Sequence, residues 1–154
     1  MSRYARAMAA VTMSVEIERS VEDVFAVLTH VELASTWSRA ISEELITPGP
    51  MRVGSRRRAV IPGVAGRTSE NVMELTEFEP DRRLAMRGMS GFPVPVRIAI
   101  DLAPRGPGTL VTWVTYLEPT GPLRLAGPLL GWGYKALFSK DLARLKSMME
   151  AGTL

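Results

Sequence analysis

Turn-forming residues divide the middle of this chain, between residues 41 and 117, into segments of strand length. Clusters rich in proline and glycine occupy positions 48–50, 62–66, 79–81, 88–93 and 104–108. The clearest segment between them has five apolar residues at alternate positions: Val94, Val96, Ile98, Ile100 and Leu102. This period of two is typical of a half-buried strand, and short loops join neighbouring strands as hairpins. The pattern predicts five or six consecutive strands in an antiparallel meander.

The segment before this meander predicts one more strand and two short helices. Residues 13–18 alternate between apolar and polar side chains, which indicates a strand. Ser20 then precedes an acidic first turn and an apolar helical face, the pattern of a capped helix. A second helical fragment is expected over residues 31–36, with Trp37 directly after it.

The C-terminal segment, residues 121–151, is helical in character. Pro128 is tolerated in the first turn of a helix, but deeper inside it would remove a backbone hydrogen bond and clash with the preceding turn. The helix is therefore expected to start, restart or kink near Gly127 and Pro128. Beyond that point one stripe of residues recurs every three or four positions, made of Gly131, Tyr134, Phe138, Leu142, Leu145 and Met149. This stripe is expected to pack on the sheet.

Length and composition fit one globular domain. The chain has 154 residues, 46% of them hydrophobic, so we expect a single domain over residues 1–154 with its core between about residues 12 and 150. No cysteine is present, which excludes disulfides, thiolate nucleophiles and cysteine-bound metals. The first apolar stretch is broken by Thr12, Ser14 and Glu16. We therefore expect no signal peptide, no stable membrane insertion and a cytoplasmic location.

Charge and polar residues exclude several further functions. The arginines behind the net charge of +3 are scattered among acidic residues, so no basic stripe for nucleic acid is expected. The single histidine, His30, is expected to be solvated near the end of the first helix. No phosphate-binding glycine loop, serine-centred elbow or convergent catalytic pair is found. Catalytic residues are therefore unknown, and no metal or cofactor is expected.

Several short patterns occur in an order that is characteristic of a known superfamily. They are residues 20–25 with Trp37 after them, Val53-Gly54, Glu79-Pro80 with Arg83-Leu84, Gly108-Thr109 with Val111-Thr112, and residues 141–146. Over residues 12–150 the chain resembles the SRPBCC superfamily, which includes START-like lipid-transfer domains, birch-pollen-type allergens and bacterial polyketide cyclases. The resemblance implies an α+β helix-grip fold, in which a curved antiparallel sheet of six to seven strands wraps round a long C-terminal helix. Two short helices follow the first strand, and a cavity lies between sheet and helix.

Three consecutive arginines at positions 56–58 decide which face of one hairpin points toward that cavity. Neighbouring side chains on a strand point to opposite faces, so Arg57 is separated from the other two. If residues 62–66 form the hairpin loop, Arg57 lies opposite Asn71, on the more apolar face. We assign this face to the cavity, where both residues would contact a polar group of a ligand. The alternative is that the Arg57 guanidinium reaches water or pairs with a nearby carboxylate.

The same reasoning selects the rest of the cavity wall. Large aromatic side chains supply wall area and shape, and methionines adapt to varied ligands. The predicted ligand-binding residues are Trp37, Arg57, Asn71, Met73, Met86, Phe92, Ile98, Trp113, Tyr134 and Phe138. Trp37 and Phe92 sit in or beside loops, where a cavity mouth is expected. For Ile98 the simpler interpretation is ordinary core packing.

Three functions follow from these features and from the resemblance. The first is binding or transport of a hydrophobic or amphiphilic small molecule, such as a lipid, a quinone or an aromatic polyketide-like metabolite. The second is a polyketide aromatase or cyclase that uses the same cavity, with Arg57, Asn71 and Tyr134 as orienting groups. The third is a protein-interaction module like the chaperone-activator or ribosome-associated branches, which would need an exposed apolar patch on the outer sheet face. Monomer and dimer are both compatible with the sequence.

Overall fold

The computed structural model describes residues 9–154. The expectation that no signal peptide is present rests partly on residues 1–8, which lie outside the described residues. In chain order the elements are β1 (Ala9–Ile17), α1 (Val21–Thr29), η2 (Val31–Leu33), α2 (Ala34–Trp37), β2 (Ser42–Leu45), β3 (Arg56–Pro62), η3 (Val64–Gly66), β4 (Thr68–Glu79), β5 (Arg83–Ser90), β6 (Val96–Arg105), β7 (Gly108–Leu117), η4 (Gly121–Ala126) and α3 (Gly127–Glu150).

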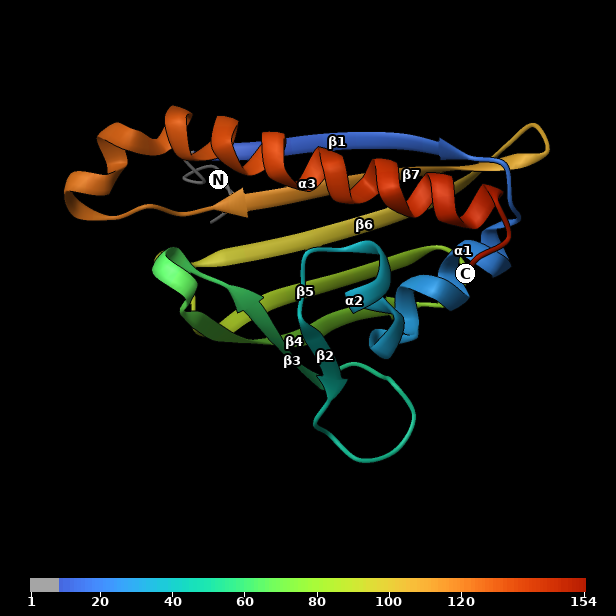
Figure 1. Cartoon of the computed structure of the whole chain (residues 1–154), viewed down its shortest axis with the longest axis horizontal. Helices are drawn as coiled ribbons and strands as arrows, with labels where there is room; N and C mark the ends of the chain where they lie inside the picture. Colours follow the sequence, from blue (N-terminus) through green and yellow to red (C-terminus); the bar gives the residue numbers. More distant parts are fainter. Residues whose placement is uncertain (1–8) are drawn as a thin grey trace.

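Seven strands form one antiparallel sheet in the order β1-β7-β6-β5-β4-β3-β2. Strands β2 to β7 follow one another as a meander, and β1 joins the far edge beside β7. Figure 1 shows α3 lying across one face of this sheet, along β1 and β7. The short helix α2 contacts both α3 and β2, which lie toward opposite edges of the sheet. These observations confirm the helix-grip α+β architecture, with seven strands.

Particular residues set the helix boundaries. Ser20 caps α1, because its side chain accepts a hydrogen bond from the Asp23 backbone N–H at 3.2 Å. Pro128 lies in the first turn of α3, where no backbone hydrogen bond is lost, and η4 precedes it as a separate short helix. The predicted start near Gly127 is therefore confirmed.

The hairpin of β3 and β4 has a different register from the one predicted. Arg57 pairs with Met73 and not with Asn71. The loop covers residues 63–67, one position later than assumed, because the ladder continues through Pro62. This change moves the register by two residues, so every side chain keeps its face. The predicted pairing was wrong, whereas the predicted separation of the two faces is correct.

Two strand boundaries also differ from the predictions. β1 begins earlier than expected, at Ala9, and β6 begins later, at Val96. Val94 therefore lies in the loop before β6. Its neighbours Pro93 and Pro95 lack the backbone N–H that a ladder needs. Val94 is nevertheless buried, which explains why it fits the apolar alternation.

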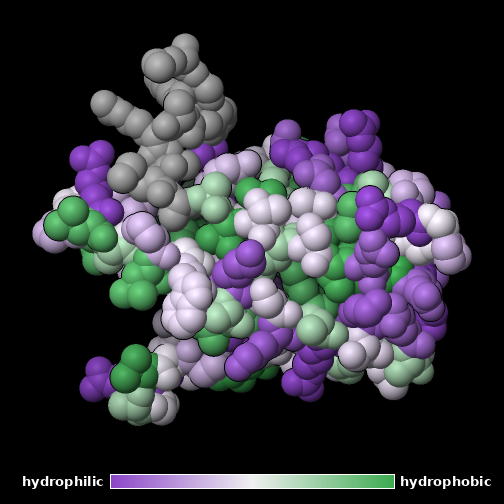
Figure 2. Space-filling view, turned by 90° about the horizontal axis from the view of Figure 1, so that it is seen from above, coloured by the Kyte–Doolittle hydropathy of each residue, from purple (hydrophilic) through white to green (hydrophobic). Residues whose placement is uncertain are grey.

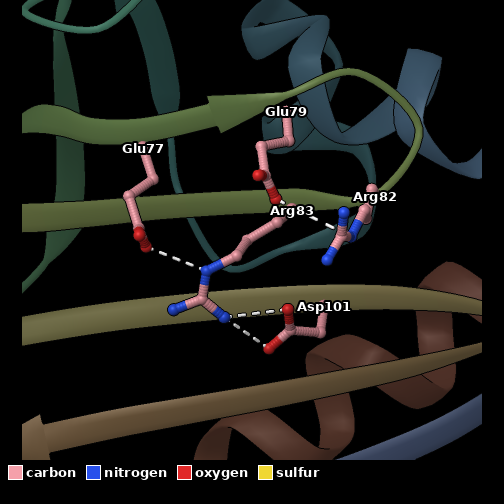
Figure 3. Close-up of polar contacts among 5 residues, drawn as sticks. All are labelled: Glu77, Glu79, Arg82, Arg83 and Asp101. Carbon is pink, nitrogen blue, oxygen red and sulfur yellow. Dashed lines mark hydrogen bonds and ion pairs between the residues drawn. The ribbon is translucent and has the colours of Figure 1, made fainter.

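Ion pairs cover the outer face of the sheet. Figure 3 shows Arg83 of β5 between Asp101 of β6 and Glu77 of β4. The guanidinium lies 2.7 Å from Asp101 and 2.8 Å from Glu77, and these hydrogen bonds raise the pKa of Arg83 above its usual value. Beside it, Arg82 lies 3.8 Å from Glu79. A face laced with compensating charges is not the apolar patch that a protein-interaction module of the expected kind needs.

Candidate ligand cavity

A cavity of about 520 Å³ lies between the sheet and α3. This volume falls within the range of small-molecule sites, roughly 300–1,000 Å³. Strands β3 to β7 supply its floor, and α3 covers it with Tyr134, Phe138 and Leu142. Trp37 at the end of α2 and Phe92 in the loop between β5 and β6 complete the wall. The wall is mostly apolar, with a few polar side chains among hydrophobic and aromatic ones.

All ten residues selected from the sequence lie at this wall: Trp37, Arg57, Asn71, Met73, Met86, Phe92, Ile98, Trp113, Tyr134 and Phe138. Their strands place them there through the alternation of side chains, and α3 does so through its stripe. Ile98 is buried in the core and lines the cavity as well, so the two interpretations of this residue are compatible. The ten predicted residues therefore lie together at one cavity, and their contact with a ligand remains a prediction.

Three aromatic rings and one cation form the corner of the cavity under α3. Tyr134 and Phe138, one helical turn apart, stack with ring centroids 4.1 Å from each other and planes 20° apart. The Trp113 ring of β7 lies 6.4 Å from Phe138. The Arg39 guanidinium also lies over the Phe138 ring, 4.4 Å from the ring centroid, in a cation–π arrangement. The corner therefore presents aromatic side chains to the cavity, and they offer apolar contact area to a ring system of a ligand.

The Tyr134 hydroxyl is a polar group inside this aromatic corner. It lies 2.8 Å from the Thr115 hydroxyl, and Thr115 itself is fully buried. Burial raises the pKa of Tyr134 to about 12, while Thr115 and the nearby Trp113 indole oppose the rise. Tyr134 is therefore a neutral phenol at physiological pH, able to donate or accept one hydrogen bond.

Arg57 is paired within the protein. Its guanidinium forms an ion pair with Glu43 of β2, and another of its nitrogens lies 3.7 Å from the Met86 sulfur. Both charged side chains are nearly buried, at 10% and 14% exposure. Of the two alternatives for Arg57 set out above, pairing with a nearby carboxylate is thus the observed one. The ion pair leaves this part of the wall polar but without net charge.

An acidic and a basic side chain also lie near the aromatic corner, Asp141 and Arg39. Asp141 of α3 follows Phe138 by one turn, and both Asp141 and Arg39 line the cavity. Burial raises the pKa of Asp141, and the cationic Arg39 opposes this rise. Asp141 is therefore a carboxyl group whose environment favours proton uptake more than water does.

Unpartnered polar atoms concentrate at this cavity. Among residues 9–154, the buried side-chain nitrogen and oxygen atoms without a well-formed hydrogen bond are Trp37 Nε1, Arg57 Nε, Asn71 Oδ1, Trp113 Nε1 and Asp141 Oδ2. Every one of these residues lines the cavity. Buried polar groups in folded proteins are nearly always hydrogen-bonded, to protein, water or ligand. The cavity thus presents three donors and two acceptors to whatever fills it.

The sequence reasoning missed three charged residues of the wall, Arg39, Glu43 and Asp141. Glu43 lies on β2, whose four residues show no apolar alternation from which its face could be inferred. Arg39 lies in the connection between α2 and β2, where no periodic pattern applies. Asp141 stands at helical spacing from Tyr134 and Phe138, and this signal was available in the sequence.

No group of three or more metal-binding side chains is found within residues 9–154. His30 lies 3.7 Å from Glu32, and its side chain is 57% exposed, as expected. None of the helices between residues 9 and 154 has the length and apolar character needed to cross a membrane.

Comparison with known proteins gives both a family and a fold. Residues 8–150 match the sequence profile of a family described as polyketide cyclase / dehydrase and lipid transport. No curated protein matches the chain. A solved structure from Thermus thermophilus has a TM-score of 0.77 at 19% identity, covering 95% of this chain and 100% of its own. One from Nitrosomonas europaea has a TM-score of 0.75 at 17% identity, covering 96% and 97%.

A START superfamily protein from Mycobacterium smegmatis is also similar, with a TM-score of 0.70 at 17% identity. The alignment covers 92% of this chain and 94% of that protein. At these identities the likeness concerns the fold, which is START-like.

Proposed function

Since this chain belongs to the polyketide cyclase / dehydrase and lipid transport family, we propose that it binds a neutral, amphiphilic small molecule in the cavity between the sheet and α3. The observation that carries the proposal is the cavity itself, about 520 Å³ of mostly apolar wall that holds all the unpartnered buried polar side-chain atoms found among the described residues. Such a combination of apolar area and few polar anchors is typical of small-molecule sites.

The charges of the wall favour a neutral ligand. Arg57 is compensated by Glu43, and Arg39 lies near Asp141, so neither cation offers an unopposed charge to a carboxylate or phosphate. An anionic ligand would have to displace Glu43 or approach Asp141. A neutral ligand avoids both costs.

The unpartnered atoms of the cavity wall indicate which polar groups the ligand carries. The indole N–H groups of Trp37 and Trp113 and the Nε–H of Arg57 are donors, which suit carbonyl or ether oxygens. Asn71 Oδ1 and Asp141 Oδ2 are acceptors, which suit hydroxyl groups. Hydroxylated quinones and phenolic polycyclic ketones carry both kinds of group on a flat ring system that fits the aromatic corner.

Native mass spectrometry of protein purified from its own host, followed by solvent extraction, tests this function most directly. We expect a bound neutral molecule with an aromatic or quinone ring. The protein is then titrated with a hydroxylated quinone and, in parallel, with a fatty acid. Binding is read by tryptophan fluorescence in a Trp132→Phe background, which leaves Trp37 and Trp113 of the cavity wall as the tryptophans. A cavity that is solvent-filled and unresponsive to lipid and aromatic libraries would contradict the proposal.

Asp141 favours a second candidate, cyclisation of a poly-β-ketone chain. A carboxylate with a raised pKa, facing an apolar cavity, is suited to take a proton from a methylene between two carbonyls. The resulting enolate carbon would bond to a second carbonyl carbon of the same chain, and that carbonyl oxygen would receive a proton. Asp141→Asn should then abolish cyclisation of a poly-β-ketone mimic while binding persists. Equal cyclisation rates with and without protein would exclude this candidate.

A further inference from the structure

Exposed apolar side chains gather at the junction of η4 and α3. The group, called the α3 patch from here on, consists of Leu123, Leu125, Leu129, Leu130, Trp132 and Leu137. Leu125 is 92% exposed, Trp132 72% and Leu129 69%. In Figure 1, η4 and the start of α3 form the left end of the molecule, and Figure 2 shows exposed apolar side chains at that same end. Scattered single apolar residues are ordinary on a surface, but a group from one short segment indicates a contact surface.

The first half of α3 is apolar on both of its sides. One side carries Tyr134 and Phe138 into the cavity, while Leu129, Trp132 and Leu137 are exposed to solvent. An apolar side of a helix is normally covered by other parts of the protein or by a partner. Farther along α3 the outer side becomes polar, since Arg144 and Ser147 are exposed there. The uncovered apolar surface is thus confined to the part of the helix that lies beside η4.

The charge of this segment is one-sided. Residues 119–140 contain Arg124, Lys135 and Lys140 and no aspartate or glutamate. Elsewhere on the described residues, arginines such as Arg56, Arg58 and Arg83 are paired with carboxylates. The ion pairs found within residues 9–154 include none of the three cations of the segment. An apolar surface with cations and no anions is complementary to a negatively charged, apolar partner.

The α3 patch is continuous with the cavity. Leu123 of η4 and Leu130 of α3 belong to the patch and also line the cavity wall. A partner that covers the patch therefore lies beside the cavity.

We infer that the α3 patch docks reversibly on an anionic lipid surface. Leucine and tryptophan side chains enter the boundary between headgroups and acyl chains, and lysine and arginine beside them contact anionic headgroups. Trp132 is suited to this boundary, where an indole keeps its N–H hydrated. A two-fold dimer through the same patch would bring like cations of the two copies together, which opposes self-association. The inference extends the proposed function, because docking places the cavity next to an apolar phase.

Vesicle co-sedimentation of the full chain tests the inference. Vesicles of phosphatidylcholine alone are compared with vesicles that also contain phosphatidylglycerol, and we expect binding to the anionic vesicles that weakens as the salt concentration rises. The double variant Leu129→Ser/Trp132→Ser should bind at least about tenfold more weakly, since two large apolar side chains no longer enter the lipid. Both residues are exposed, so the fold should persist.

The matched control is Val53→Ser, another exposed apolar residue, 59% exposed and outside the α3 patch, which should leave vesicle binding unchanged. Equal vesicle binding by the double variant and the unchanged chain would overturn the inference. A second result would also overturn the inference. In it the unchanged chain binds neither kind of vesicle and forms a dimer, and the substitutions Leu129→Ser/Trp132→Ser dissociate that dimer. Quinone binding in vesicle-free buffer separates the two proposals, because it depends on the cavity alone and should survive in the double variant.

Discussion

Arg57 of β3 and Glu43 of β2 form an ion pair in the cavity wall, with 10% and 14% of their side chains exposed. The pair connects the edge strand β2 to the strand beside it. It also makes the most deeply placed cation of the wall unavailable to an anionic ligand. Stability and ligand choice are therefore coupled at these two residues.

Glu43→Gln should destabilise the protein, because it leaves the Arg57 guanidinium nearly buried without a counter-charge. Removing one partner of a buried pair costs about 3 kcal/mol or more, so we expect a loss of about 3 kcal/mol in the free energy of unfolding. Denaturant unfolding measures it. The double variant Glu43→Gln/Arg57→Met should recover most of the loss, since it buries no charge. A double variant as unstable as the single one would show that the pair is not the cause.

The same substitution should change ligand preference. In Glu43→Gln the Arg57 charge becomes available, so affinity for a fatty acid should rise about tenfold relative to a neutral quinone. Parallel titrations of both ligands against both proteins measure this ratio. If the unchanged protein already prefers the fatty acid, the neutral-ligand proposal is wrong.

Tyr134 should make stability fall at high pH. Its pKa is about 12 in the folded protein against 10.0 for a free tyrosine, because burial disfavours the phenolate. Between pH 10 and 12 the unfolded chain has released this proton and the folded chain has not, so the free energy of unfolding falls as pH rises, by about 2 kcal/mol. Below pH 10 the contribution is fully present.

Tyr134→Phe provides the control for that pH dependence. It should lose less stability than the unchanged protein over the same pH interval, and its tyrosinate absorbance should lack the late-titrating component. Identical alkaline stability curves for the two proteins would argue against a buried Tyr134 hydroxyl.

Gly91 should tolerate no side chain. It has a φ of +83°, and an added Cβ would lie 1.9 Å from the Glu70 carbonyl oxygen. Gly91→Ala must therefore move the loop that carries Phe92, and we expect a loss of about 2–3 kcal/mol. Gly106→Ala is the matched control, because Gly106 also has positive φ, +54°, but open space around it. The control should cost only about 1 kcal/mol in thermal or denaturant unfolding. Equal losses would mean that φ, and not the contact with Glu70, sets the cost.

Much of the site followed from periodicity. The two-residue alternation of β6 fixes the face of Ile98, and the helical stripe places Tyr134 and Phe138 together. The face of Arg57 was predicted correctly in spite of a wrong register, since a shift of two residues preserves faces.

What periodicity cannot supply is the partner of a polar residue. Glu43 comes from a short edge strand without alternation, and its approach to Arg57 depends on how β2 meets β3. The exposure of Leu129 and Trp132 has the same origin, because only the assembled fold decides which apolar side chains in the first half of α3 are covered.

Filling the cavity tests the central claim, that this chain holds a neutral amphiphile between its sheet and α3. Ala59 lines the cavity, so Ala59→Trp reduces its volume, whereas Ala103→Trp adds the same side chain at an exposed position of β6. Native mass spectrometry of both variants and the unchanged protein, purified from the same host, measures the bound fraction. We predict a neutral ligand on the unchanged protein and on Ala103→Trp, and its loss from Ala59→Trp. A ligand retained equally by all three proteins, or found on none of them, would contradict the account.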